Sequence, residues 1–357
     1  LAELTRLEAE TYKKGNFSTY FARKGLITVF IDSTERSPTF RLFPLDTVKE
    51  AKRKCWIQVW TPTATLSEAW QAFLGRPFRG LSRAFYEKPF EQEISDPYLK
   101  KAAVESLKKA GDDQQFLYDF SLDEFNLNTR GPSQGDLGVI VFLSPEEEQL
   151  GQKGSSFRKF IDLFLRKGAN VSMILVSEKS SEDTAKLIRE VQGFDAGEKD
   201  SVVILHIEGK NDPLGLNRQV ALKILLNTHS TAVMTSLGKV IGNTMTNVSP
   251  SNLKLIGRAT YLIQSHVNDV LSRPEWTRLY GKQNPISYQE ANAVLFDAIG
   301  FVKDNVEAGQ TAEVAISIIR ILESLRLKKG FSNENALSIV KNTGLSDYLS
   351  RFSSQVK

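Results

Sequence analysis

Four short runs of the chain are almost entirely apolar and rich in β-branched residues, and they limit what the chain can fold into. The runs are LITVFI at 26–31, LGVIVFL at 137–143, VSMILVS at 171–177 and SVVILHI at 201–207. A strand with one face in water alternates apolar and polar residues, whereas these runs are apolar on both faces. We therefore predict strands of a parallel sheet that helices cover on both sides.

Helical patterns separate these runs. SSFRKFIDLFLRKG at 155–168 places its apolar residues on one face, and SSEDTAKLIREVQG at 180–193 opens with serines that can cap a helix. Alternating strands and helices are typical of a doubly wound α/β fold. From about residue 208 the chain turns to long helical patterns, at 216–245 and 252–273, and its last 70 or so residues are typical of a small all-helical unit.

The predicted fold class is therefore α/β, a doubly wound parallel sheet flanked by helices, with a C-terminal all-helical unit. We expect one domain over 1–275 and a second over 276–357, because a chain of 357 residues can bury more than one core. The tryptophan-containing region 44–120 has the weakest pattern. We expect it to be an insert that decorates the first crossover.

Composition narrows the class of protein. Lysine and arginine total 46 and aspartate and glutamate 42, mixed throughout, so no basic stripe of the kind that binds nucleic acid is expected. No window approaches the ~18 consecutive apolar residues of a membrane helix. The one cysteine, Cys55, cannot form an internal disulfide and fits a reducing compartment. We expect a cytoplasmic protein, and because the chain opens at Leu1 within a helical pattern, we expect a fragment of a longer one.

The segment DSTERSPTF at 32–40 follows the first apolar run, so we place it at the carboxyl end of a strand, where α/β proteins build ligand sites. Glu35 in that position could remove a proton from a carbon next to a carbonyl, if partial burial raised its pKa. The alternative is a solvated loop glutamate paired with Arg36 or Arg41. Residue types alone leave both interpretations open.

A second candidate lies in the helical pattern from 216. Lys223 is surrounded by apolar residues, so its ammonium must reach a cleft, a partner or water, and either a phosphate contact or a snorkelling side chain would satisfy it. Asn227, Ser230 and Thr231 either face the same pocket or bond backbone carbonyls one turn back. His229 between them is either a general acid or a structural hydrogen-bonding group.

Metal and cofactor sites are not expected. The three histidines have no metal-type spacing, and no cluster of cysteine and histidine exists. Two stretches, 144–156 and 177–184, have the serine and glycine content of a phosphate-binding turn, but the first contains three consecutive glutamates that would repel an anion.

The residues from 223 onwards carry a pattern that resembles the sugar isomerase (SIS) proteins of the N-acetylmuramic acid 6-phosphate etherase and glucokinase regulatory protein group. Segment 32–40 similarly resembles an etherase segment in which an Asp, a catalytic Glu and Pro-Thr-Phe occur in that order. The tail at 312–344 resembles the small helical C-terminal unit of the same group. The matching residues of the first two stretches are Asp32, Glu35, Pro38, Thr39, Phe40, Lys223, Leu226, Asn227, Ser230, Thr231, Leu237, Gly238, Lys239, Asn243, Met245, Asn252, Lys254 and Leu255.

This resemblance implies an SIS fold that binds a phosphosugar without a cofactor. Glu35 would be the catalytic acid/base, and Lys223 would close on the ligand. The other residues expected to bind substrate are Arg36, Ser37, Thr39, Asn227, Ser230 and Thr231.

The chain departs from the etherase pattern at its phosphate-binding loops. Where a loop rich in Gly, Ser and Thr should precede the catalytic Glu, STYFARKGL at 18–26 offers only Ser18, Thr19 and Gly25, and SPEEE follows the run at 137–143. In this the chain resembles the C-terminal SIS half of glucokinase-regulatory-like proteins, in which two SIS halves lie in tandem. We therefore expect a second SIS half, in tandem or as a homodimer, to hold most of the ligand.

Three functions stay open at this point. The first is a phosphosugar isomerase or etherase that acts through Glu35. The second is a non-catalytic sugar-phosphate sensor that regulates a sugar kinase. The third is a structural half with no ligand of its own.

Overall fold

The computed structural model describes residues 1–50, 52–189, 191, 200–209, 212–250, 252–305 and 313–352. The chain divides into two compact units. We call the first, residues 1–33 and 45–229, the α/β unit, and the second, residues 34–44 and 230–357, the helical unit. Segment 34–44 therefore belongs to the helical unit, although the chain on both sides of it belongs to the α/β unit. The main boundary between the units lies near residue 230, whereas the sequence predicts a domain boundary near 275. The extent of the SIS domain itself stays a prediction.

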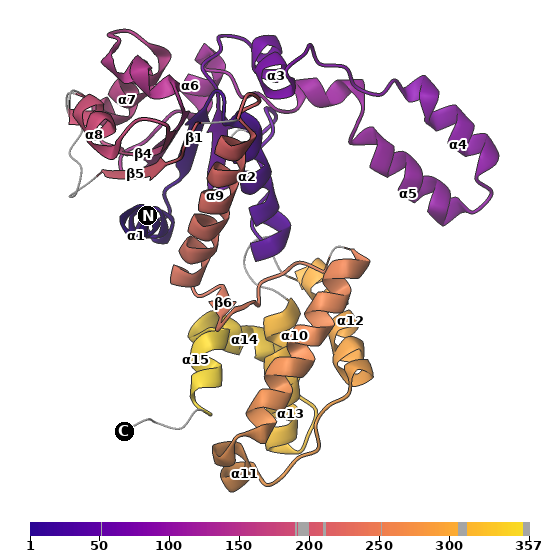
Figure 1. Ribbon diagram of the computed structural model, residues 1–357. Coiled ribbons are helices and arrows are strands. Elements are labelled where there is room, and N and C mark those ends of the chain that lie inside the picture. Colours follow the sequence, from indigo (N-terminus) through magenta and orange to yellow (C-terminus); the bar gives the residue numbers. More distant parts are fainter. Residues whose placement is uncertain are drawn as a thin grey trace. The chain divides into compact units, whose positions relative to one another are not determined.

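The α/β unit is built on a five-stranded sheet whose strands all run parallel, in the order β2-β1-β3-β4-β5 (Figure 1). The predicted fold class is therefore confirmed. Three of the predicted strands are present, with small changes of boundary. The strands are β1 (Ser18–Ala22), β2 (Ile57–Trp60), β3 (Leu137–Leu143), β4 (Asn170–Ser177) and β5 (Ser201–His206).

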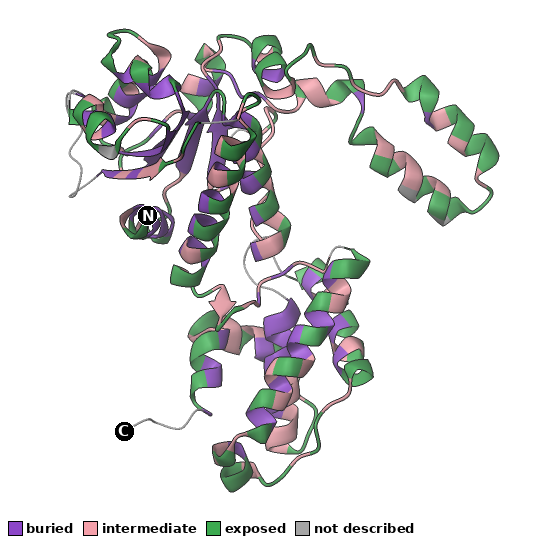
Figure 2. Ribbon diagram, viewed as in Figure 1, coloured by how far each residue is buried: buried purple, intermediate pink, exposed green. Residues whose placement is uncertain are grey.

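Helices cover both faces of this sheet. On one face, phenylalanines of α7 (Ser156–Arg166) pack with Ile188 of α8 (Ser181–Arg189) against strand residues such as Phe21 and Phe142. On the other face, α9 (Leu216–Ser236) lies beside α2 (Leu26–Phe40), with α1 (Ala2–Lys13) nearby (Figure 1). All residues of β1, β2 and β3 are buried (Figure 2), as uniformly apolar strands require.

The predicted strand at 26–31 is wrong, because LITVFI begins helix α2. Its exposure has a helical period: Leu26 and Val29 are buried, whereas Ile27 and Ile31 are 47% and 41% exposed. The β-branched residues favour a strand, but the tertiary packing of this amphipathic segment overrides that preference. The first strand is instead the less apolar STYFA of β1. Segment 32–40 consequently lies in a helix that contains Pro38, and not in a loop after a strand.

The region 44–120 contains part of the sheet as well as an extension. Strand β2 pairs with β1 as an edge of the sheet, and α3 (Leu66–Leu74) begins with a capping box formed by Thr65 and Glu68. After it come α4 (Glu87–Glu93) and α5 (Pro97–Lys108), which pair with each other and have no buried residue among their described side chains (Figure 2). The expectation of a pure insert is therefore only half right.

The C-terminal part of the chain is mostly helical. The predicted helix over 216–245 ends at Ser236, and a short antiparallel hairpin of β6 (Val240–Ile241) and β7 (Thr244–Met245) follows. The remaining helices share one apolar core. They are α10 (Leu253–Ser272), α11 (Pro274–Tyr280), α12 (Tyr288–Asn305), α13 (Glu313–Leu327), α14 (Asn333–Thr343) and α15 (Leu345–Ser350).

The exchanged segment 34–44 is tied into the helical unit by polar contacts. Arg41 donates to both carboxylate oxygens of Glu313, at 2.7 and 2.5 Å, and the two side chains are only 15% and 6% exposed. The backbone N–H of Ser249 donates to the carbonyl of Pro38 at 3.0 Å. The chain therefore crosses between the units three times, twice within helices α2 and α9.

Candidate functional site

The carboxyl ends of β1 and β3 are where a ligand site is expected. In the strand order 2-1-3-4-5, the connections leave β1 and β3 toward opposite edges of the sheet, and ligands of such folds bind in the crevice outside this switch point. Arg23, Lys24 and Gly25 follow β1, and Ser144 to Glu148 follow β3. Unpaired backbone N–H groups at such strand ends can hold an anion.

Glu146 occupies this position. Its carboxylate accepts a hydrogen bond from the backbone N–H of Lys24 at 3.0 Å and another from that of Leu143 at 3.1 Å. We call these two donors the switch-point amides. Glu146 is 3% exposed, and burial raises its pKa, although the two amides and the charges of Lys24 and Arg23 act in the opposite direction. A carboxylate of the chain itself thus lies where an anionic ligand would accept hydrogen bonds.

Glu147 closes the neighbouring strand end. It is fully buried and accepts hydrogen bonds from the hydroxyls of Ser144 at 2.5 Å and Ser177 at 2.8 Å. Its other oxygen, Oε2, is buried without a hydrogen-bond partner among the described residues. The sequence predicts that three consecutive glutamates after β3 would repel an anion. Two of them, Glu146 and Glu147, have buried side chains.

Helices α2 and α9 form a polar seam beside this edge. Thr28 donates to Gln219 at 2.5 Å, and one turn further along both helices Lys223 Nζ lies 3.6 Å from Asp32 Oδ1. The two helices thus run parallel and side by side (Figure 1). Gly25 permits this approach, because a Cβ there would lie 2.9 Å from Leu222. Lys223 is 28% exposed and Asp32 only 2%, so the lysine is partly buried and paired.

The predicted site residues fall into two sets, one in each unit. Lys223 and the exposed Asn227 belong to the α/β unit, whereas the other six belong to the helical unit. Among these, Glu35 is exposed, Arg36 is 2% exposed, and Ser37 donates to the carbonyl of Leu42 at 3.0 Å. Thr39 is half-buried, Ser230 is buried and Thr231 is exposed. Their roles in binding stay predictions.

His229 takes part in a buried network that sequence reasoning missed. Its side chain and that of Glu8 on α1 are both fully buried and hydrogen-bonded to each other. Tyr20 donates to Glu8 at 2.7 Å, and the hydroxyl of Thr5 contacts Nδ1 of His229 at 3.1 Å. These contacts agree with the structural interpretation of His229. Glu8 carried no sequence signal beyond its helical period.

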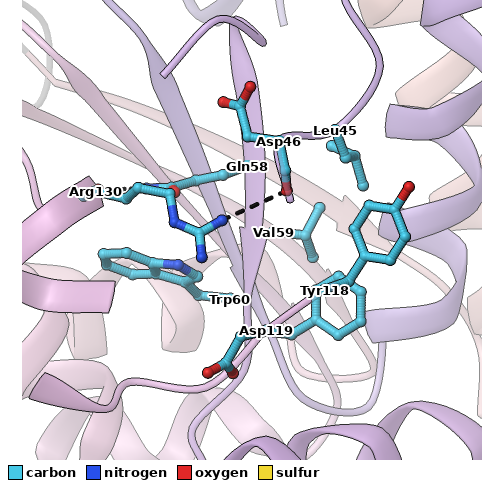
Figure 3. A pocket seen from close by; sticks show the side chains of 9 residues that line it. Leu45, Asp46, Gln58, Val59, Trp60, Tyr118, Asp119 and Arg130 are labelled. Atoms are coloured by element: carbon cyan, nitrogen blue, oxygen red, sulfur yellow. Dashed lines mark hydrogen bonds between the residues drawn. The ribbon is translucent and has the colours of Figure 1, made fainter. Parts of the chain in front are cut away.

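A small polar pocket lies on the edge strand β2 (Figure 3). Arg130 donates to the carbonyl of Asp46 at 3.5 Å there, and burial lowers the pKa of Arg130 and raises that of Asp46. Gln58 Oε1 is buried without a partner among the described residues. The cavity measures about 20 Å³, which suits one water molecule and no larger ligand.

Among the described residues, no group of three or more His, Cys, Asp and Glu side chains could hold a metal ion. Within the same residues, no helix has the length and apolar character needed to cross a membrane.

Curated relatives match parts of the chain. A protein of Clostridium acetobutylicum is 37% identical over 100 residues, which cover 25% of this chain and 33% of the relative. One of Lactobacillus gasseri is 38% identical over 99 residues, covering 26% and 32%. One of Synechococcus sp. strain CC9605 is 52% identical over 44 residues, covering 12% and 14%. Each is named N-acetylmuramic acid 6-phosphate etherase.

Part of this chain is similar to N-acetylmuramic acid 6-phosphate etherases. The resemblance inferred from the sequence pattern is thereby confirmed. The matches span at most a third of the length of these etherases, and no family model matches the chain. The parallel sheet with its flanking helices and C-terminal helical unit is consistent with an SIS-like fold.

Proposed function

We propose that this chain is a non-catalytic sugar-phosphate sensor of the SIS type, which binds its ligand together with a second SIS half. The observation that carries this proposal is the carboxylate of Glu146 on the switch-point amides. A phosphate at the same place would lose those two donors and would lie against Glu146 and Glu147, at a Coulombic cost that is large in a buried site. The ligand therefore binds mainly to the other half.

Lys223 is the residue through which this chain contacts the ligand. Its ammonium is 3.6 Å from Asp32, longer than a close ion pair, and it keeps 28% of its surface exposed. A sugar phosphate that approaches the α2–α9 seam offers a stronger, charge-assisted contact to this ammonium. Asn227, one turn later on α9 and exposed, supplies a hydrogen-bonding group on the same helix.

Exposed apolar side chains on the same two helices support a second SIS half as partner. Ile27 and Ile31 of α2 are 47% and 41% exposed, and Val220 and Ile224 of α9 are 57% and 63% exposed. They flank the residues of the seam, and clustered apolar surface of this kind marks protein interfaces. In the isolated chain, a second copy must supply the missing half.

The test is thermal stabilisation by fructose 6-phosphate, glucosamine 6-phosphate and N-acetylmuramic acid 6-phosphate at millimolar concentration. We expect one of them to raise the melting temperature in a way that depends on protein concentration. Lys223→Ala should weaken that stabilisation, whereas Lys186→Ala, an exposed lysine of α8, should leave it unchanged. Ile224→Glu should give a monomer in light scattering and abolish the stabilisation. Absence of any shift at high protein concentration contradicts the proposal.

Catalysis through Glu35 is the second candidate, and the similarity to etherases favours it. In that case Glu35 removes the proton beside the carbonyl carbon of the sugar phosphate and returns a proton to the product. The discriminating measurement is deuterium wash-in from D₂O at that carbon. A sensor gives no exchange, whereas exchange that is lost in Glu35→Gln would establish the enzyme and refute the sensor.

A further inference from the structure

A larger cavity lies at the carboxyl end of the edge strand β2, away from the α2–α9 seam. It measures about 480 Å³, within the range of sites for small organic ligands. Residues 62–64, which follow β2, form one wall, and α7 forms another. Leu122 and Leu127 close it, the latter from α6 (Glu124–Arg130), and both pack on the same core as α7. We call this cavity the β2 pocket.

The floor of the β2 pocket is apolar and rigid. Phe160, 1% exposed, stacks on Phe21 at 4.5 Å and on Phe164 at 4.3 Å between ring centroids, so its ring is held in place. Leu163, one turn further along α7, is half-buried and lines the same side. With Leu122 and Leu127 they give an apolar surface suited to an aliphatic or aromatic body.

The charged residues that line the β2 pocket are all positive. Lys159 and Arg166 of α7 line it and are exposed, and no carboxylate is among its lining residues. Arg166 donates through Nε to the carbonyl of Asp162 at 3.0 Å. Two nearby carboxylates have backbone partners: Glu68 accepts from Ala64 and Thr65, and Asp123 accepts from Asn126.

Hydrogen-bond donors complete the set. Ser156 lines the pocket at the first residue of α7, where the helix dipole and the first backbone N–H groups favour an anion. Thr63 also lines the pocket, but its hydroxyl oxygen is buried out of reach of the cavity.

We propose that the β2 pocket binds a small amphipathic anion, whose apolar body rests on Phe160 and Leu163 and whose acidic group meets Lys159 and Arg166. The positive lining selects a carboxylate or sulfonate over a neutral or cationic molecule of the same shape. This site shares no residue with the Lys223 seam, and it stands whether or not the chain binds a sugar phosphate.

The experiment is calorimetric titration of the full chain with octanoate, and with octanol as the neutral analogue, supported by displacement of 8-anilinonaphthalene-1-sulfonate. We expect octanoate to bind with one-to-one stoichiometry and octanol to bind roughly tenfold more weakly or not at all. Lys159→Gln should weaken octanoate by roughly the same factor without affecting octanol. Lys167 is the exposed C-cap residue of α7 and does not line the pocket, so Lys167→Gln is the control and should change nothing.

Two further variants keep the result decisive. Leu163→Trp fills the pocket and should abolish binding of both molecules; if that variant fails to fold, Lys159→Glu tests the same site from its exposed rim. Equal binding of octanoate and octanol, or an effect of Lys167→Gln as large as that of Lys159→Gln, would overturn the proposal. Fructose 6-phosphate should not displace octanoate, which separates this site from the proposed sugar-phosphate site.

Discussion

Two places along the carboxyl edge of the sheet differ in the charge of the side chains that line them. Beyond β1 and β3, the switch-point amides already donate to Glu146, and Glu147 fills the adjoining strand end. Beyond β2, the β2 pocket is open and lined by Lys159 and Arg166. The backbone N–H groups of Thr61, Thr63 and Ala64 after β2 also have internal acceptors. The two places therefore differ in the side chains that line them, acidic beyond β3 and basic beyond β2.

Removing the internal carboxylate should have the largest effect. Glu146→Ala leaves two buried N–H groups without an acceptor, so we expect a loss of roughly 2 to 6 kcal/mol in the free energy of unfolding. Inorganic phosphate at millimolar concentration should restore part of this stability, because it can accept from the vacated amides. Urea unfolding with and without phosphate measures both effects. An equal phosphate effect on the wild-type chain would contradict the assignment of this position to Glu146.

The floor of the β2 pocket depends on Gly138 in β3. A Cβ at this position would lie 2.8 Å from Phe164 and 2.9 Å from Phe160, so the ring that floors the β2 pocket could not keep its position. Gly138→Ala should cost about 1 to 3 kcal/mol of unfolding free energy and weaken octanoate binding. Gly300→Ala is a suitable control, because an alanine Cβ there would have nothing within 4 Å apart from its chain neighbours and the backbone of its own helix. The helix should gain about 0.5 to 1 kcal/mol. If Gly138→Ala left the unfolding free energy unchanged, α7 would have to be able to shift away from β3.

The pH dependence of stability should reveal the internal carboxylate. Because the pKa of Glu146 is raised above its ordinary value of 4.5, the folded chain holds this proton more tightly than the unfolded chain. Glu146 therefore favours folding at low pH, and this contribution is lost as the pH rises through the raised pKa. Glu146→Gln removes the dependence, so its melting temperature should improve relative to wild type as the pH rises above 4.5, the ordinary pKa of a glutamate. A constant difference would argue against a buried, titrating Glu146.

The smallest effect on the free energy of unfolding is expected at Glu148, two residues after Glu146. Glu148 is 55% exposed and pairs with Lys179 at 2.9 Å, also at the surface. Glu148→Ala should change the unfolding free energy by less than about 1 kcal/mol and create no response to phosphate. It is thus the matched control for Glu146→Ala, measured in the same urea titrations. If Glu148→Ala lost as much unfolding free energy as Glu146→Ala, the effect would come from disturbing the whole loop and not from the carboxylate of Glu146.

Sequence patterns predicted the part of the fold that burial dominates. The runs that became β3 and β4 are almost completely buried, and their composition alone indicates a covered parallel sheet. The edge strand β5 is equally apolar in sequence but only partly buried. The run at 26–31 failed because a short β-branched segment cannot be assigned by propensity when its neighbours set the exposure. Strands β1 and β2 were missed because Ser18, Thr19 and Gln58 are polar yet buried. Ser18 donates to Glu8, and Gln58 donates through Nε2 to Thr19.

The candidate site was predictable only in part. The resemblance points to Lys223, whose role stays a prediction, and the SPEEE motif marks the loop that contains Glu146 and Glu147. That Glu146 bonds the amides of Lys24 and Leu143 depends on a contact across more than a hundred residues, which no local pattern carries. Neither Glu8 nor the β2 pocket had a sequence signal, because each is assembled from segments far apart in the chain.

The segment 34–44 that the helical unit borrows from the N-terminal part of the chain has a practical consequence for dissecting this protein. A fragment that starts at residue 230 would keep Glu313, which is almost completely inside the unit, but would lack Arg41, its bidentate cation. To express the helical unit alone, segment 34–44 must be supplied as a separate peptide or joined to it by circular permutation. Truncation at any single residue leaves one of the two units incomplete.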